Sequence, residues 1–376
     1  MLGLYVHVPF CASICNYCNF NRGLFDAGLK DRYVAAVCAE IASAAGPSSP
    51  ARVDTIFFGG GTPSLLEPAE IGGIVDVCRQ SFDLSSDTEV TLEANPETVT
   101  VDRLEGFRQA GINRVSFGVQ SFRDEELRRL SRLHSASRAR EAVAMARAAG
   151  FDNVSLDLMM WLPQQSVAQW LSSIDALIDI RPQHASLYLL EIYPNAPLRD
   201  AMARDCWSVA PDDDVAEMYV SGLDRMDNAG YVQYEISNVA RPGRESRHNL
   251  KYWIDGEWLG FGCGAHSTRG GARWKNLSST EEYIAAINDD GRVATERRSL
   301  TADERIEEAL FTGLRLNAGL HLPAVKDRYG IDVWARYGGE LQSFVDRGVL
   351  LYDGRSLRLN RAGMLLAHEI MAVFIS

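Results

Sequence analysis

Three of the chain's seven cysteines stand close together near the N-terminus, at a spacing that can bind an inorganic centre. Cys11, Cys15 and Cys18 form a C-x3-C-x2-C pattern directly after the apolar run Leu4–Val8. Thiolates are ligands that suit zinc and iron–sulfur clusters. Structural zinc needs four ligands, but the position two residues after Cys18 is Phe20. The pattern therefore favours an iron–sulfur cluster with one open iron over a zinc site or three unrelated buried thiols.

Composition and charge restrict the class of protein. With 376 residues, 46% of them hydrophobic and 23% charged, the chain is typical of a soluble globular protein with one large and one smaller domain. A net charge of −12 and a pI near 5.1 disfavour binding to nucleic acid or to anionic membranes. No apolar run reaches the roughly 18 residues that span a bilayer, and no signal peptide is recognisable. Seven cysteines without a disulfide-scaffold pattern suit a reducing compartment, so we expect a cytoplasmic protein.

Apolar, β-rich segments alternate with segments of helical period through the first half of the chain. The expected strands are Leu4–Val8, Val53–Phe58, Glu89–Glu93, Arg114–Gly118, Val154–Met159 and Ala185–Leu190. The expected helices are Lys30–Ala45, Pro68–Ser81, Val101–Ala110, Ala136–Ala149 and Ser166–Ile178. This alternation predicts an α/β fold with a parallel sheet and right-handed crossovers. Six units are too few for an eight-fold barrel, so a partial barrel and an open doubly wound sheet both remain compatible with it.

Polar or glycine-rich residues stand at the ends of several expected strands. The loop Gly59–Pro63 (GGGTP) follows the second strand, Glu93 ends the third, Gln120 follows the fourth, and Asp157 lies within the fifth. The glycines let backbone amides approach a ligand closely, although the loop has neither the lysine of a P-loop nor the spacing of a dinucleotide-binding motif. In parallel α/β folds chemistry collects at the carboxyl ends of strands. We therefore expect these residues to share one site.

The second half of the chain has a different pattern. A helix is expected at Asp212–Asn228, followed by the polar and aromatic segment His248–Trp253. Three further helices and a hairpin are then expected, at Ala302–Leu316, Leu322–Tyr329, Trp334–Arg347 and Val349–Leu359. This order is typical of a small α+β unit of winged-helix type, and the acidic balance favours docking and stability over DNA binding. The expected units are a barrel with the cluster site at 1–200, a central segment at 201–298 and the winged-helix-like domain at 299–376.

The cysteine pattern, Tyr17 before its third cysteine and the GGGTP loop together resemble the radical S-adenosylmethionine (SAM) enzymes. The resemblance implies a [4Fe–4S] cluster on Cys11, Cys15 and Cys18, whose open iron chelates the amino and carboxylate groups of SAM. Reductive cleavage of SAM to a radical is the chemistry of that family. The resemblance also implies a partial six-unit (β/α) barrel.

Residues that match the family's SAM-binding motifs lie on successive strand ends. The implied SAM contacts are Tyr5, Tyr17, Gly60, Gly61, Thr62, Glu93, Gln120, Arg132 and Asp157. Arg132 is suited to pair with the methionine carboxylate, and Glu93 or Asp157 to accept hydrogen bonds from ribose hydroxyls or the amino group. No catalytic residue is assigned. The family usually has glycine where Trp161 precedes Leu-Pro, so the shape of the pocket there is an open question.

Within that superfamily, YVHVPFC, FFGGGTP, SFGVQSF and the D-x4-LP segment are similar to the branch of oxygen-independent coproporphyrinogen III oxidase, over nearly the whole chain. The oxidase continues its motif as C-x3-C-x2-C-x-C and has a longer N-terminal extension. Here Phe20 occupies the fourth position, and ten residues precede Cys11. In both respects, and in its H-N-x-x-Y-W motif at His248–Trp253, the chain resembles the heme chaperone family HemW.

The HemW resemblance implies a protein that binds heme and transfers it to an acceptor hemoprotein, such as a membrane-bound respiratory one, with a homodimer linked to cofactor binding. The implied heme contacts are His248, Asn249, Tyr252 and Trp253. Histidine is a common axial ligand of heme iron, and aromatic rings can cover a porphyrin face. The alternatives are an oxidase that decarboxylates two propionates of coproporphyrinogen III, and a radical methyltransferase that acts on heme. Whether the chain is an enzyme therefore stays open.

Overall fold

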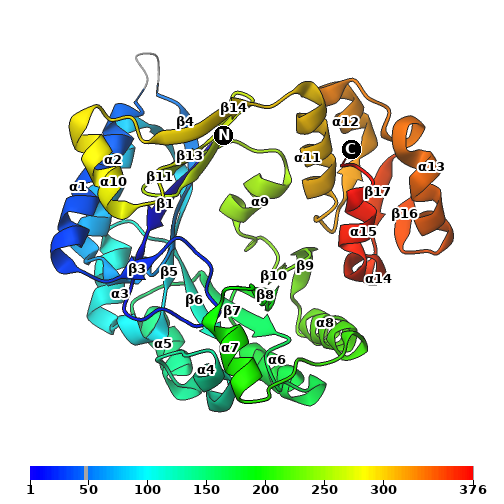
Figure 1. Cartoon of the computed structure of the whole chain (residues 1–376), viewed down its shortest axis with the longest axis horizontal. Helices are drawn as coiled ribbons and strands as arrows, with labels where there is room; N and C mark the ends of the chain where they lie inside the picture. Colours follow the sequence, from blue (N-terminus) through cyan, green and yellow to red (C-terminus); the bar gives the residue numbers. More distant parts are fainter. Residues whose placement is uncertain (46–49, 376) are drawn as a thin grey trace.

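The computed structural model describes residues 1–45 and 50–375, and its main feature is a strongly curved sheet wrapped by helices (Figure 1). Six adjacent strands run parallel: β1 (Leu2–Val8), β4 (Arg52–Gly60), β5 (Asp83–Ala94), β6 (Arg114–Gln120), β7 (Val154–Met160) and β8 (His184–Leu189). The strand order within the sheet is β14-β13-β12-β11-β1-β4-β5-β6-β7-β8-β10-β9 in the described residues. This is the partial six-unit (β/α) barrel, and the expected α/β fold class is confirmed.

Alternation along the strands separates a helix-facing apolar layer from a polar barrel interior. On β5, Val90 and Leu92 are buried in the apolar core, whereas Thr91 and Glu93, which alternate with them, point to the other side. Side chains alternate across a strand, so a polar interior can be built on strands whose outer face is fully apolar. The polar residues are thereby directed into the barrel, where they can serve a site.

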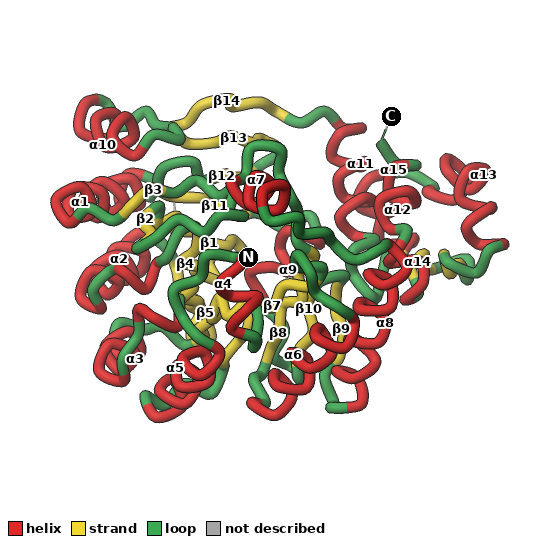
Figure 2. The backbone as a smooth tube through the Cα atoms, turned by 60° about the horizontal axis from the view of Figure 1, so that its bottom comes forward, coloured by secondary structure: helices red, strands yellow, loops and turns green. Residues whose placement is uncertain are grey.

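Helices cover the outer face of the parallel strands, as Figure 2 shows in red around yellow strands. They are α1 (Ala27–Ser43), α2 (Pro68–Ser81), α3 (Val101–Gln109), α5 (Ala136–Ala148) and α6 (Val167–Ile180). In addition, α8 (Asp212–Asn228) packs on α6, where Trp170 is fully buried and donates its indole N–H to the Met218 carbonyl at 2.8 Å. A Cβ at Gly222 would lie 2.8 Å from the Trp170 indole nitrogen, so glycine permits this close approach.

Shorter elements connect or extend these layers. They are β2 (Phe10–Cys11), β3 (Gly23–Leu24), η1 (Pro63–Leu65), η2 (Pro96–Thr98), α4 (Asp124–Arg129), α7 (Pro197–Arg204), β9 (Val232–Glu235), β10 (Asn238–Ala240), α9 (Arg247–Trp253), β11 (Trp258–Phe261), β12 (His266–Arg269), β13 (Ala272–Asn276), α10 (Thr280–Asp289) and β14 (Ala294–Ser299). Strand β11 runs parallel to β1, while β12, β13 and β14 continue the sheet antiparallel. The strands of the second half thus extend both edges of the barrel sheet.

The C-terminal part forms a separate small layer of helices around a three-stranded sheet, at the right of Figure 1. Its elements are α11 (Ala302–Gly313), β15 (Leu320–His321), α12 (Leu322–Tyr329), α13 (Val333–Asp346), β16 (Leu350–Tyr352), β17 (Ser356–Leu359), α14 (Arg361–Leu365) and α15 (Ala367–Ala372). Arg361 forms ion pairs with Asp224 and Asp227 of α8, which tie this layer to the barrel. No helix in residues 1–45 and 50–375 is long and apolar enough to cross a membrane.

A buried carboxylate, Glu40, joins α1 to the segment that follows β11. It accepts hydrogen bonds from the Tyr283 hydroxyl at 2.6 Å, the Gly262 N–H at 2.8 Å and the Asn276 amide at 2.7 Å. Burial nevertheless raises the pKa of Glu40 to about 7, because desolvation disfavours the charged form. The Glu40 carboxyl group therefore binds a proton more tightly in the folded protein than in the unfolded chain.

We expect Glu40→Gln to flatten the pH dependence of the free energy of unfolding. A pKa raised from 4.5 to about 7 gives a stability contribution that is full below about pH 4.5 and is lost as the pH rises through about 7. The contribution of this one group is about 3 kcal/mol at most. Urea unfolding at several pH values measures the slope, and the exposed Glu125→Gln is the matched control. An equal slope in Glu40→Gln and the parent would contradict the expectation.

Candidate functional site

A cavity of about 390 Å³ opens at the carboxyl ends of the parallel strands. The three cysteines of the motif line it, as do eight of the nine predicted SAM contacts. These residues are Cys11, Cys15, Cys18, Tyr17, Gly60, Gly61, Thr62, Glu93, Gln120, Arg132 and Asp157. The ninth, Tyr5, lies deeper in the barrel, where its hydroxyl is 3.1 Å from His7 Nδ1 and its ring stacks on Phe57. Residues from six separate segments of the sequence thus meet in one place.

The cysteine loop is folded so that its thiols face this cavity. Cys11 is buried on β2, and Cys15 and Cys18 are half-buried in the turn that follows, closed by a 3.2 Å hydrogen bond from the Cys18 N–H to the Cys15 carbonyl. The Thr62 hydroxyl lies 3.6 Å from Cys11 Sγ, and the Arg132 guanidinium donates to Cys15 Sγ at 3.4 Å. All three thiols are free, so they are available as ligands.

The three thiols of the motif line one cavity. Within the described ranges, no group of three or more His, Cys, Asp or Glu side chains could hold a single metal ion. A mononuclear zinc site requires all its sulfur ligands about 2.3 Å from one atom. An iron–sulfur cluster is bound differently, because each cysteine ligates a different iron atom. Cysteine thiolates are the donors that hold such clusters.

The glycine loop after β4 lies against the segment that leads to the cysteines. Gly60 has φ +114°, and a Cβ there would lie 2.5 Å from the His7 ring. A Cβ at Gly61 would lie 2.7 Å from the Phe10 carbonyl oxygen, and the Gly61 N–H donates to the Val8 carbonyl at 2.7 Å. Only glycine fits these two positions without displacing the cysteine segment. The loop thus forms a narrow floor along which a ligand can contact the backbone.

Arg132 provides a positioned cation in the cavity wall. Its guanidinium donates to the Asn95 side-chain oxygen and to the Gly118 carbonyl, each at 2.7 Å, as well as to Cys15. These contacts fix the plane of the guanidinium, and a fixed fork of donors suits a carboxylate. Arg132 thus lies next to a cysteine of the motif, and its contact with SAM stays a prediction.

Two half-buried acids, Glu93 and Asp157, line the cavity. Glu93 accepts a hydrogen bond from the Gly60 N–H at 3.2 Å, and Asp157 accepts one from the Ser116 hydroxyl at 3.2 Å. Burial, and then the negative charge of Asp157, raise the pKa of Glu93 to about 8. Burial also raises the pKa of Asp157. A cationic ligand between them would favour the ionised forms of both acids, so the pair is suited to bind positive charge.

Trp161, where the family usually has glycine, has a left-handed backbone with φ +65°. Glycine adopts this conformation without steric cost, whereas a tryptophan is strained there. The indole does not line the cavity: its N–H donates to the Ala210 carbonyl at 2.8 Å. The substitution thus leaves the cavity wall unobstructed and adds a contact to the segment before α8.

The H-N-x-x-Y-W motif lies on α9, at the opposite end of the barrel from the cysteines. The Glu89 carboxylate accepts hydrogen bonds from the first two N–H groups of α9, at Arg247 and His248. On the same helix, Lys251 pairs with Asp54 at 2.6 Å and donates to the Met1 carbonyl at 3.1 Å. Met1 and Asp54 lie at the amino ends of β1 and β4, and Glu89 lies in the middle of β5, so α9 packs against the amino-terminal parts of these strands.

His248 itself is fully buried, and both ring nitrogens have partners. Nδ1 lies 2.9 Å from the Thr55 hydroxyl, Nε2 lies 2.9 Å from the Tyr252 hydroxyl, and the ring stacks on Phe57 with centroids 5.2 Å apart. Burial lowers its pKa to about 3, so the ring is neutral near pH 7. Arg315 lies over the Trp253 ring, 4.3 Å from its centroid. In this conformation neither nitrogen of His248 is free to bind an iron atom.

We expect His248→Ala to lower the free energy of unfolding by about 2–4 kcal/mol, because it leaves a cavity and removes the hydrogen-bond partner of the buried Thr55 hydroxyl and of the Tyr252 hydroxyl. Urea unfolding of the protein without cofactors measures the effect. His368→Ala is the control, since the His368 side chain is 81% exposed. A loss no larger than that of the control would contradict a structural role for His248.

Several cavity residues were not predicted as contacts. Asn95 donates to the Thr62 hydroxyl at 3.1 Å and accepts from Arg132, so it links two predicted contacts. The Ser116 hydroxyl donates a hydrogen bond to the Asp157 carboxylate, and the Arg22 guanidinium donates one to the Cys18 carbonyl. Asn95 follows Glu93 at a strand end, which is a recognisable signal. Ser116 and Arg22 have none, because their roles depend on neighbours that are remote in sequence or on the fold of the loop.

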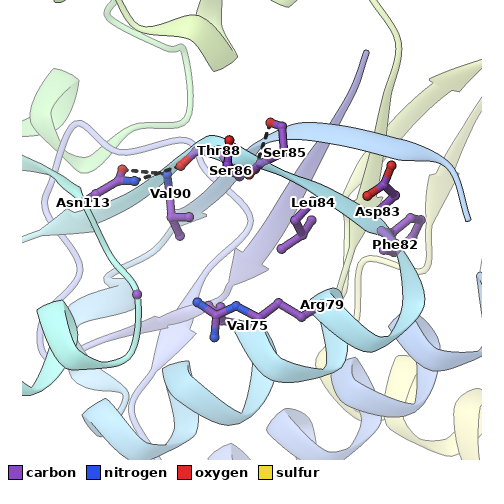
Figure 3. Close-up of a pocket in the computed structure, with 11 residues that line it drawn as sticks. Val75, Arg79, Phe82, Asp83, Leu84, Ser85, Ser86, Thr88, Val90 and Asn113 are labelled. Carbon is purple, nitrogen blue, oxygen red and sulfur yellow. Dashed lines mark hydrogen bonds between the residues drawn. The ribbon is translucent and has the colours of Figure 1, made fainter.

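A second cavity, of about 500 Å³, lies at the amino ends of β5 and β6 and beside the end of α2 (Figure 3). Three of its polar side chains are already paired: Asn113 accepts from the Val90 N–H at 2.8 Å, the Thr88 hydroxyl donates to the Ser85 carbonyl at 2.7 Å, and Arg79 pairs with Asp76. It is lined by no cysteine or histidine. The larger cavity is therefore a poorer candidate than the one beside the cysteines.

Comparison with known proteins agrees with the geometry. Residues 5–177 match the Radical SAM superfamily, and residues 300–366 match the HemN C-terminal domain. The heme chaperone HemW of Bacillus subtilis is 34% identical over 376 residues, which span 100% of this chain and 99% of that protein. The chain belongs to the HemW family. A [4Fe–4S] cluster and SAM are the cofactors of the radical SAM superfamily to which this family belongs.

Other similarities extend over nearly the whole chain. The mitochondrial radical S-adenosyl methionine domain-containing protein 1 of Bos taurus is 36% identical, over 99% of this chain and 87% of that protein. The solved structure of coproporphyrinogen III oxidase (HemN) from Escherichia coli superposes with a TM-score of 0.87, at 24% identity, over 99% of this chain and 89% of that one. The HemN likeness establishes the fold, including the small C-terminal layer.

Proposed function

We propose that this protein is a heme chaperone: it binds a [4Fe–4S] cluster, SAM and heme, and transfers the heme to an acceptor hemoprotein. The cluster would be held by Cys11, Cys15 and Cys18, and SAM by the residues that line the cavity beside them. When bound, the cluster supplies an open iron that orients SAM and can pass an electron to it. The protein would act in the cytoplasm, where reducing conditions keep its cysteines free.

The observation that carries the heme part of the proposal is an apolar rim around the mouth of the cavity. Of the twelve large hydrophobic side chains that are exposed in the described part of the chain, seven lie in two segments beside the cysteines. Five of them, Ile14, Phe20, Tyr188, Leu189 and Tyr193, line the cavity, and Leu24 and Phe25 follow in the same segment as Phe20. Exposed apolar residues gathered in one place mark a binding surface. A heme macrocycle is a flat apolar ligand of the kind that such a rim suits.

The chain's own residues have distinct tasks in this proposal. Arg132 would hold the SAM carboxylate, while Glu93 and Asp157 would face the positive charges of SAM. The glycines at 60 and 61 would let backbone groups contact the cofactor, and Phe20 would contribute apolar surface where the oxidase has a fourth cysteine. The small C-terminal domain, the central segment and the barrel, at 299–376, 201–298 and 1–200, would form the three functional units.

The chain has two candidate heme-binding regions: the rim of the cavity and the H-N-x-x-Y-W motif on α9. Because His248 is buried and both of its ring nitrogens have hydrogen-bond partners, the rim is favoured as the heme-binding surface. The exposed side chains of Leu189 on the rim and Ile254 beside the motif allow a matched test. Heme titration followed by its absorption band should be weakened by Leu189→Glu and unaffected by Ile254→Glu. The reverse result would place heme at the motif.

The function is tested with anaerobically reconstituted protein. We expect one heme to bind per chain, transfer to an apo-hemoprotein, and no change in the tetrapyrrole when SAM and reductant are supplied. Conversion of coproporphyrinogen III to a vinyl product would instead identify an oxidase, and a methylated or opened heme would identify a methyltransferase. Size-exclusion chromatography with and without cluster and SAM tests the proposed homodimer. Absence of heme binding in the parent would refute the proposal.

A further inference from the structure

A buried arginine in the barrel interior has an unsatisfied hydrogen-bond donor. Arg114, at the start of β6, is only 2% exposed, and its Nε has no hydrogen-bond partner within residues 1–45 and 50–375. Its strand neighbour Thr91, directly opposite on β5, is fully buried, and its hydroxyl also lacks a partner. Burying an unpaired cation is costly, so such a residue is expected to serve a charge nearby.

The charges that Arg114 faces are those of the cofactor site. Along β6 the next interior positions after Arg114 are Ser116, which is paired with Glu93 on β5, and Gly118, which is paired with Asp157 on β7. Two residues along a strand span about 7 Å, a distance that an arginine side chain can cover. The positive charge of Arg114 favours the ionised form of both acids, and so partly offsets the rise in their pKa values that burial causes. The guanidinium thus lies beneath the acid pair.

The other groups around Glu93 supply no second cation. They are the Asp157 carboxylate on β7, the Gly60 N–H on β4, and the Tyr5, Tyr188 and Tyr252 hydroxyls on β1, β8 and α9. Burial raises the pKa of each of these three tyrosines, so they are neutral near pH 7. Arg132 acts on Asp157 from the opposite side, at the cysteine end. Arg114 is therefore the cation that Glu93 faces in the barrel interior.

We propose that Arg114 is a positioning residue for SAM binding, whose buried positive charge favours the ionised forms of Glu93 and Asp157 opposite the cationic cofactor. The proposal rests on the role of these two acids in the proposed function. SAM carries a sulfonium and an ammonium group, so a protonated acid pair would bind it poorly. Arg114 does not touch the cofactor. It determines the charge of the residues that do.

The test compares Arg114→Met, which removes the charge, with Arg114→Lys, which keeps it. The SAM dissociation constant of protein with equal cluster content is measured by equilibrium dialysis from about pH 6 to about pH 9. We expect Arg114→Met to weaken binding near pH 7 by about tenfold for each unit that the pKa of Glu93 rises, and to recover affinity at high pH. Arg114→Lys should restore most of the affinity. Arg138→Met, on the outer helix α5, is the matched control.

A second measurement needs no cofactor. In the cluster-free protein, the raised pKa of Glu93 makes a stability contribution that is lost as the pH rises through about 8. In Arg114→Met this loss should move to higher pH, and in Glu93→Gln it should disappear. An equal weakening of SAM binding at all pH values, or an unshifted stability profile, would overturn the proposal.

A further variant separates the proposal from the site on which it rests. If Glu93→Gln binds SAM as the parent does, the assignment of the acids to the cofactor is wrong, and the proposal for Arg114 falls with it. If Glu93→Gln binds SAM weakly while Arg114→Met binds it normally, only the role of Arg114 is wrong.

Discussion

Replacement of Cys15 by serine is expected to reduce the iron and sulfide of the reconstituted protein from a [4Fe–4S] cluster to background. The motif offers three thiolates, and in the described structure no other cysteine lines the cavity. A cluster that loses one of three protein ligands exposes a second iron to solvent, which makes it unstable. Iron analysis and the visible absorption of the anaerobic protein measure the effect.

The chain offers a matched control for this variant. Cys206, at the end of α7, is exposed and free, so Cys206→Ser changes the same chemistry away from the site. Its iron content should equal that of the parent. Unfolding experiments on the cluster-free Cys15→Ser variant exclude a folding defect, since Cys15 is only half-buried. Full iron content in a folded Cys15→Ser protein would contradict the assignment of this residue as a ligand.

Arg132→Met is expected to weaken SAM binding by about 10- to 100-fold, because hydrogen bonds to a charged group contribute about 1.5–3 kcal/mol. The variant keeps most of the side-chain volume and removes the donors that would face the methionine carboxylate. Equilibrium dialysis with cluster-loaded protein measures the dissociation constant. Arg128→Met, on the exposed face of α4, is the control and should bind SAM normally.

A loss of affinity in Arg132→Met has two physical origins, which Arg132→Lys separates. The guanidinium also holds Asn95 and the Gly118 carbonyl, so its removal disturbs the cavity wall. Lysine retains the positive charge but lacks the planar fork. If the charge dominates, Arg132→Lys recovers most of the affinity; if the fork dominates, it recovers little. Normal binding in both variants would contradict a role for Arg132 in SAM binding.

The sequence predicts the long elements of this fold well, because their signals are local. The expected α2, α8 and α12 have the bounds that the structure gives them, and the six parallel strands were expected within a few residues at each end except at the start of β5. There the polar residues before Glu89 lack an apolar alternation, so the strand begins at Asp83 without a sequence signal. The short strands β9 to β15 were missed because segments of two to six residues carry too little periodicity.

The sequence also determined which residues belong to one site. Cysteine spacing, glycines and acids at strand ends predicted a shared cavity, because the carboxyl ends of parallel strands meet at one edge. The spacing of motifs along the chain thus carried three-dimensional information. In the sequence, Phe20 already indicated that the motif has no fourth cysteine. The structure adds that the Phe20 side chain is 67% exposed and lines the cavity.

Only the tertiary structure decided the surroundings of the remaining polar residues. In the sequence His248 stands among groups suited to heme, but in the fold Thr55, Phe57 and Tyr252 enclose it at the other end of the barrel. In the same way, Arg114 is an ordinary strand residue in the sequence, whereas in the described structure it is a buried cation whose Nε has no hydrogen-bond partner. The physical reason is that exposure, hydrogen-bond partners and local charge depend on residues far apart in the chain, which a local pattern does not contain.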